Sequence, residues 1–221
     1  KRRRRTKRSQ RQHPLPEKIA NGLFLDFEGF APHSKQNVRA PAMCGYRIGG
    51  EGNVTQVVFS RKLRAAGRAS GIEVCDDWKQ FIRSLLKEHA GRKIFAFSEH
   101  EQQVLKLATG HEIRRRYENL RKIAKRWRRI HVPELCDDEN TLLDFLKAAG
   151  ITVPKNYGQG QVTEKLRSVR EYSTSTKRWA AAPDKVKKDW ENVLKHNAFD
   201  VSSMYELLSV IERDKMKSTN R

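Results

Sequence analysis

Apolar and polar positions alternate over several short stretches in the first half of the chain. The stretches at residues 22–28, 42–48 and 54–60 are rich in branched and aromatic side chains, which predicts three β-strands. Three glycines separate the second and third stretches, as expected for a hairpin loop. A further apolar stretch at residues 92–98 predicts a fourth strand.

One helix is expected before this fourth strand and another after it. Residues 75–89 place apolar side chains at helical spacing, and Asp76 or Asp77 can cap the first turn. After the strand, Ser98 and Glu101 have the spacing of a capping box. A second helix is therefore expected to begin at Ser98.

The second half of the chain is mainly helical in its pattern. Residues 111–130 have the most regular helical periodicity, with Lys and Arg at the positions that are not apolar. Residues 131–135 are a candidate fifth strand. Residues 140–149 predict a helix ended by Gly150, and Pro183 is expected to start a last helix that reaches about residue 213.

These elements predict an α/β fold, with a mixed five-stranded sheet flanked by helices and a basic helical elaboration. Residues 1–20 are expected to form a disordered basic arm and linker, because their charges repel one another and two prolines favour extended backbone. Residues 21–214 would form the folded domain, and residues 215–221 a polar tail. A chain of 221 residues is long enough for one such domain with a buried core.

The charge of the chain indicates its partner. The formal net charge is +20, and the first twelve residues carry eight Lys or Arg and no acid, so the rest of the chain still carries +12. Such an excess favours a polyanionic partner, DNA or RNA, because phosphate binding releases condensed counterions. An acidic membrane surface is the competing partner, but no long apolar run or lipidation motif supports it.

The cysteines and the basic start of the chain bear on its location. Cys44, Cys75 and Cys136 are odd in number and far apart, which is typical of reduced thiols in a cytoplasmic protein. Association with the nucleoid fits the same pattern. No apolar stretch follows the basic start, so no secretory signal is expected. Further domains or protein partners outside this chain are left open.

The first candidate site lies on the first predicted strand. Asp26 and Glu28 alternate along this strand and therefore face the same side, amid apolar neighbours. Burial of two like charges is unfavourable unless a cation joins them, and Mg²⁺ or Mn²⁺ prefers such oxygen ligands. The alternative is a strand end that reaches solvent, with both acids hydrated.

Two other candidate positions lie on predicted helices. His196 and Asp200 are four residues apart and share one face of the last helix, where an imidazole can act as a base beside a metal ligand. Glu101 follows a strand by one helical turn, so it projects near the carboxyl ends of the strands. The respective alternatives are a surface ion pair and a helix cap.

These three segments together resemble the motifs of the DEDD exonuclease superfamily, in its YprB-like or RecB-associated branch. LFLDFEGF is similar to the first motif, AFSEHEQQVL to the second, with Glu in place of the usual Asp, and HNAFDVSSMYELL to the third. The resemblance covers about residues 22–212, and the motifs have the family's order. One departure is that His196 precedes Asp200 by four residues, whereas a catalytic histidine in this family usually precedes the acid by five.

The resemblance implies an RNase H-like fold and a nuclease that uses two divalent ions, Mg²⁺ or Mn²⁺. Asp26, Glu28, Glu101 and Asp200 would be the metal ligands, and His196 would be the general base. The expected activity is hydrolysis of phosphodiester bonds in DNA or RNA by a two-metal mechanism, with a 3′–5′ exonuclease favoured.

The basic helix and the arm would hold the substrate backbone with weak sequence preference. The candidate nucleic-acid-binding residues are Arg114, Arg115, Lys122, Lys125, Arg126 and Arg129. Two functions other than a nuclease also fit these sequence features. One is a catalytically weak nucleic-acid-binding module on the same fold, and the other is an interaction protein whose basic tail docks on an RNA-rich partner.

Overall fold

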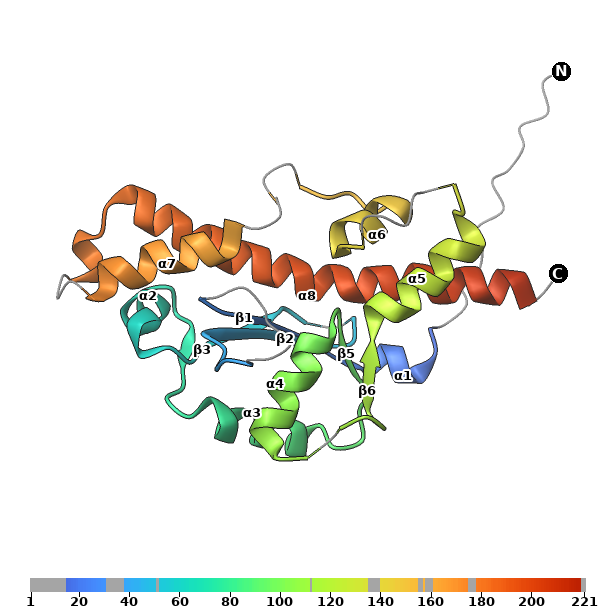
Figure 1. Cartoon of the computed structure of the whole chain (residues 1–221), viewed down its shortest axis with the longest axis horizontal. Coiled ribbons are helices and arrows are strands. Elements are labelled where there is room, and N and C mark those ends of the chain that lie inside the picture. Colours follow the sequence, from blue (N-terminus) through green and yellow to red (C-terminus); the bar gives the residue numbers. More distant parts are fainter. Residues whose placement is uncertain are drawn as a thin grey trace, which may run out of the picture.

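The computed structural model describes residues 15–30, 38–50, 52–111, 113–134, 140–154, 157, 161–174 and 178–219. Within these residues the chain is an α/β structure with one six-stranded mixed sheet and eight α-helices (Figure 1). No helix in this described part is long and apolar enough to cross a membrane. Cys44 and Cys75 are free thiols, and Cys136 lies outside the described residues.

Six short strands form one continuous sheet. They are β1 (Leu23–Glu28), β2 (Met43–Ile48), β3 (Thr55–Val58), β4 (Glu73–Val74), β5 (Ile94–Ala96) and β6 (Tyr117–Asn119). Their order across the sheet is β4-β3-β2-β1-β5-β6. β2 is antiparallel to both β1 and β3, whereas β5 and β6 run parallel to β1. The carboxyl ends of β1, β5 and β6 therefore lie at the same end of the sheet.

The helices follow or connect these strands. They are α1 (Glu17–Ala20), α2 (Arg64–Ala69), α3 (Trp78–Glu88), α4 (Glu99–Thr109), α5 (Leu120–His131), α6 (Leu142–Ala148), α7 (Gln161–Thr174) and α8 (Asp184–Thr219). Short 3₁₀ turns form over Arg61–Leu63 and Trp179–Ala181. The predicted caps are present: Asp77 caps α3, Ser98 and Glu101 form a capping box on α4, and Gly150 has the left-handed φ of 69° after α6.

Alternation along β1 divides the core between the two faces of the sheet. The odd-numbered residues of β1 pack with residues of α3 and α4 on one face. Phe24 packs on the opposite face with residues of α5, α6 and α8. Asp26 and Glu28 follow Phe24 at two-residue spacing, so their side chains emerge on the face covered by α8.

α8 is the longest element and runs across the whole sheet (Figure 1). It contains 36 residues, which corresponds to a length of about 54 Å at 1.5 Å per residue. Buried residues three or four positions apart, such as Val193, Asn197, Val201 and Met204, form the stripe that faces the sheet. Residues 196–200 of this helix lie over the second half of β1.

The outer edge of the sheet differs from the sequence-based expectation, and the sheet has six strands rather than five. Residues 117–119, predicted to be helical, form β6 because they pair with β5, and the Tyr117 hydroxyl donates a hydrogen bond to the Ser98 carbonyl. This pairing overrides a local helical pattern. α5 therefore covers only Leu120–His131. No strand forms over residues 131–134, the described part of the predicted strand 131–135, because α5 extends to His131.

Helical structure also extends beyond both ends of the predicted range 21–214. α1 lies within the expected linker at residues 1–20, because Ile19 is fully buried among residues of α8 and so anchors this turn. At the other end, α8 continues to Thr219, through most of the expected polar tail. Residues 1–14 of the basic arm lie outside the described part of the chain.

Candidate metal centre

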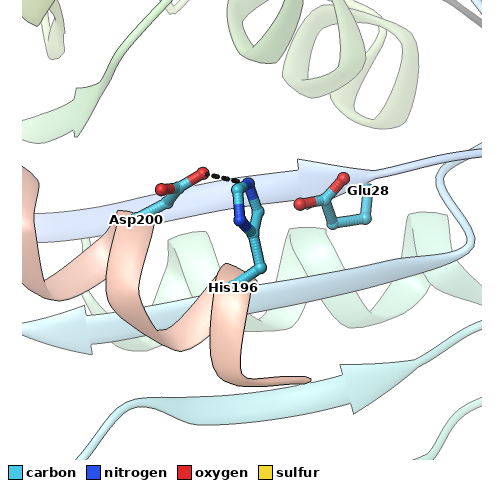
Figure 2. A group of neighbouring side chains, drawn as sticks. All are labelled: Glu28, His196 and Asp200. Carbon is cyan, nitrogen blue, oxygen red and sulfur yellow. Dashed lines mark ion pairs between the residues drawn. The ribbon is translucent and has the colours of Figure 1, made fainter. Parts of the chain in front are cut away.

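Ligand atoms from β1 and α8 meet at the carboxyl end of β1. A carboxylate oxygen of Glu28, a ring nitrogen of His196 and a carboxylate oxygen of Asp200 all lie within 4.8 Å of one another (Figure 2). All three side chains are partly buried. Among the described residues, this is the group of His, Cys, Asp and Glu side chains that is close enough to hold one metal ion between its members.

The two residues from α8 are paired. His196 Nε2 lies 3.2 Å from Asp200 Oδ2, and the side chains are 18% and 20% exposed. This agrees with the prediction that the two residues share one helix face. Tyr157 covers the imidazole, with ring centroids 5.8 Å apart and an interplanar angle of 18°. The Tyr157 hydroxyl donates to the Lys195 carbonyl at 3.0 Å, which fixes the ring beside α8.

Asp26 is held by an amide that connects it to β3. Asn197 Nδ2 donates to Asp26 Oδ2 at 2.8 Å, and Asn197 Oδ1 accepts from Gln56 Nε2 at 3.1 Å. Gln56 Nε2 also reaches the Leu194 carbonyl at 2.8 Å. Asn197 is fully buried. The contact from Gln56 orients the amide so that its N–H₂ group faces Asp26, which fixes the direction of that carboxylate.

Gly45 makes room for this amide. Gly45 is the cross-strand partner of Asp26 on β2. A Cβ at position 45 would overlap with the side-chain oxygen of Asn197. The absence of a side chain on β2 therefore allows α8 to bring Asn197 against the strand that carries Asp26.

Replacement of Gly45 by alanine should destabilise the fold by about 1–3 kcal/mol, the usual cost of overpacking a filled core. Urea unfolding of the purified protein measures this. Gly91→Ala is the matched control, because nothing lies within 4 Å of an added Cβ there. In an Asn197→Ala background the same Gly45→Ala change should cost much less, because the overlapping amide is gone. Equal costs in both backgrounds would contradict this packing.

Glu101 approaches the same acids from α4. It is only 5% exposed, and its Oε2 accepts hydrogen bonds from the Ser98 amide at 2.9 Å and the Ser98 hydroxyl at 2.7 Å. Its charge raises the pKa values of Asp26 and Glu28, so it interacts electrostatically with both. Asp26 and Glu101 lie outside the three-residue group of Glu28, His196 and Asp200. Glu101 is thus a helix cap whose carboxylate also belongs to the acidic centre.

The acids repel one another where they are poorly solvated. Burial, together with the charges of Asp200 and Glu101, raises the pKa of Asp26 to about 8. Burial and the charge of Asp26 raise the pKa of Glu28 well above its ordinary value. Burial lowers the pKa of His196, but the hydrogen bond and charge of Asp200 outweigh this, so the pKa is raised. The centre therefore favours added positive charge, supplied either by protons or by a cation.

In EDTA the protein should lose stability as the pH rises from about 4 to about 8. The pKa of Asp26 in the folded protein, about 8, exceeds its ordinary value of 3.8. Protonation of Asp26 therefore stabilises the fold fully below pH 3.8, and this stabilisation is lost as the pH rises through 8. The raised pKa values of Glu28 and His196 act in the same direction. A loss of about 2 kcal/mol would lower the Tm by roughly 4–8 °C in a chain of this size. Thermal unfolding across this pH range measures the effect.

Two comparisons make this pH effect specific to the centre. Asp26→Asn should flatten the pH dependence, because its side chain cannot ionise. Saturating Mn²⁺ should raise the Tm more at pH 8 than at pH 5, since a cation stabilises the ionised acids. A wild-type Tm that stays constant or rises relative to Asp26→Asn between pH 5 and 8 would contradict the raised pKa values.

The predicted nucleic-acid-binding residues lie at one edge of the molecule. Arg114 and Arg115 are exposed just before β6, and the other four lie on α5, where all but the half-buried Lys125 are exposed. Lys122 pairs with Glu99 at 2.8 Å. Two further cations of this segment have structural contacts: Arg116 donates to carbonyls at the end of α3, and Arg128 lies buried over the Phe145 ring.

Three residues that support the centre, Asn197, Tyr157 and Gln56, were not predicted from the sequence. Asn197 stands four residues from both Val193 and Val201, within the buried stripe of α8. A polar residue in such a stripe is the sequence signal for a buried hydrogen-bonding role. Tyr157 and Gln56 have no comparable signal, because their positions depend on how a loop and β3 meet α8.

Comparisons of this chain with family models, with curated proteins and with solved structures found no match. The function is therefore inferred from the geometry and the charges of the sheet and the acidic centre.

Proposed function

We propose that this protein is a divalent-metal-dependent nuclease of RNase H-like fold that hydrolyses phosphodiester bonds of DNA or RNA, as a 3′–5′ exonuclease. One observation carries the proposal: partly buried Glu28 and Asp200 converge with His196, and burial together with the charges of the neighbouring acids raises the pKa values of Asp26 and Glu28. Clustered acids without compensating cations are unfavourable in a folded protein unless they have a function. The mixed sheet with helices on both faces supports the same family resemblance.

The donor set fits hard divalent cations. Glu28 and Asp200 would hold one Mg²⁺ or Mn²⁺ ion beside His196, and Asp26 and Glu101 would complete a site for two ions. When bound, the two ions would supply charge stabilisation to the reacting phosphate and lower the pKa of the attacking water. The raised pKa values of Asp26 and Glu28 indicate that added positive charge is favourable there.

The protein's own side chains would orient the reactants. His196, stacked beneath Tyr157 and paired with Asp200, is positioned to accept the proton of the attacking water. Asn197 would keep the Asp26 carboxylate in one orientation. The exposed cations before β6 and on α5 would bind the phosphates of the substrate strand, which gives affinity with little sequence preference.

A cleavage assay tests this proposal directly. End-labelled single-stranded and double-stranded DNA and RNA are incubated with the purified chain in Mg²⁺, Mn²⁺ or EDTA. The expected result is stepwise shortening from the 3′ end with either metal and none in EDTA. Salt-sensitive binding without cleavage under any of these conditions would overturn the nuclease proposal and favour the binding module or the interaction protein.

A further inference from the structure

A second concave site lies at the open edge of the sheet. It is a cavity of about 440 Å³ between β6, the start of α4, α5 and the last turns of α8. Its volume is within the range of pockets that hold small ligands. We call it the β6–α5 pocket. None of the residues of the candidate metal centre lines it.

The lining of this pocket combines cations with an apolar wall. Arg114, Lys122, Arg126 and Lys215 contribute positive charge around it. Its one carboxylate, Glu118, is paired at 3.1 Å with Lys93, which does not line the pocket. Among the lining residues cations therefore outnumber the carboxylate, and two of them, Lys122 and Lys215, pair with Glu99 and Glu212 outside the lining.

The apolar wall is formed by residues of α5. Trp127 is nearly buried, and its indole N–H donates to Asp214 on α8 at 3.2 Å, which makes this wall rigid. Ile130 is 68% exposed, so it presents apolar surface at this wall. Cations beside a rigid apolar wall match the two parts of a nucleotide, its phosphate and its base.

The register of the sheet gives the distance from one lining residue of the pocket, Asn119, to the strand that carries Asp26. Asn119, which lines the pocket, pairs with Ala96 on β5, and the β1–β5 register puts Ala96 level with Leu25. Asn119 therefore lies level with Leu25, the residue just before Asp26 on β1. Two strand spacings of about 4.8 Å separate β6 from β1, which gives a distance of roughly 10 Å. A stacked strand advances about 3.4 Å per nucleotide, so this distance corresponds to about three nucleotides. The far side of the pocket is more distant, because Lys215 lies about 22 Å beyond Asp200 along α8.

We propose that the β6–α5 pocket binds one nucleotide of a single-stranded substrate, at least about three nucleotides from the phosphate at the metal centre. The inference rests on the proposed nuclease function for the position of the strand. The pocket would take a phosphate between its cations and a base against Ile130 and the α5 wall. Gln102, which also lines the pocket, is adjacent to Glu101 and connects the two sites along α4.

The test measures how affinity depends on strand length. The full chain carrying Asp26→Asn, which prevents cleavage, is titrated against fluorescein-labelled oligothymidylates of two to ten nucleotides, and Kd is measured by anisotropy at fixed salt. In this background, Lys122→Ala with Arg126→Ala should weaken binding of strands longer than about four nucleotides roughly tenfold. The same pair should leave the dinucleotide nearly unchanged, because it is too short to reach the pocket.

A second pair from the same helix provides the charge-matched control. Lys125→Ala with Arg129→Ala also removes two cations from α5, but neither residue lines the pocket. It should weaken all lengths by a similar factor, since diffuse charge acts on every strand. The Lys122–Glu99 ion pair is exposed, so its loss should not disturb folding, and a melting curve verifies this.

Three outcomes would overturn the pocket proposal. The first is that both double variants show the same dependence of Kd on strand length, and the second is that Lys122→Ala with Arg126→Ala weakens the dinucleotide and the ten-nucleotide strand equally. The third is that an acidic peptide binds as tightly as the oligothymidylates. Failure of the nuclease proposal is distinguishable, because binding is measured without turnover. If the pocket variant weakens only the longer strands and the wild-type chain shows no metal-dependent cleavage, the pocket proposal stands and the nuclease proposal is rejected.

Discussion

Replacement of Asp26 by asparagine should lower the rate of metal-dependent cleavage by more than about 100-fold and leave the fold intact. Residues that merely orient metal ligands already contribute 10–100-fold, so the loss of a ligand charge should cost more. Asparagine has nearly the same volume, and its side-chain oxygen can still accept the hydrogen bond from Asn197. Single-turnover cleavage of an end-labelled strand at saturating Mn²⁺ measures the effect.

The control for this prediction is an acid outside the centre. Asp76→Asn removes a carboxylate that is 56% exposed and pairs with Arg64 on the surface. It should leave the cleavage rate unchanged. In EDTA at pH 8, Asp26→Asn should melt at a higher temperature than the wild type, because the variant lacks the unfavourable ionisation of Asp26. A variant that cleaves at the wild-type rate would refute the role of Asp26 as a ligand.

The strands near the centre of the sheet could be predicted from the sequence because a local pattern of apolar residues reflects how they pack. β1, β2, β3 and β5 lie within predicted strands, since alternating or continuous apolar runs reflect burial on one or both faces. The side-by-side position of Asp26 and Glu28 follows from the same alternation. The helix caps were also predictable, because they depend on contacts within four residues.

The edge of the sheet could not be predicted in this way. β6 has three residues, and its strand state depends on pairing with β5 residues that lie 23 positions earlier in the chain. Tyr117 fits a helical stripe as well as it fits a strand, so the local pattern is ambiguous. The support of the centre is non-local too: Gln56 and Asn197 are separated by 141 positions, and only the docking of α8 brings them together.

Glu101 illustrates a different limit of the sequence. A capping box and a metal ligand were alternative interpretations of the same residue. In the structure the Glu101 carboxylate caps α4 through Ser98, and its charge also acts on Asp26 and Glu28. The two roles are compatible because a carboxylate has two oxygens, and the hydrogen bonds from Ser98 are accepted by one of them.

Loss of the His196 imidazole should reduce the turnover rate about 10²–10⁴-fold, the usual contribution of a general base. Asp200 holds the ring through a 3.2 Å contact, and Tyr157 stacks on it, so the imidazole is restricted to one position beside the acids. The neutral imidazole is the active form. The wild-type rate should therefore rise with pH as His196 loses its proton, and His196→Ala should lack this rise.

Three measurements on purified His196→Ala separate a base from the other roles that the geometry allows. A general base predicts a slower rate and a lost pH limb, with unchanged affinity for Mn²⁺ and little change in Tm. His89→Ala is the matched control, because His89 is similarly buried, 14% exposed, and lies far along the chain at the end of α3. A Mn²⁺ affinity that falls in parallel with the rate would make His196 a metal ligand, as its proximity to Glu28 permits. A lower Tm with an unchanged pH profile would instead make it a structural residue that supports Tyr157 and Asp200.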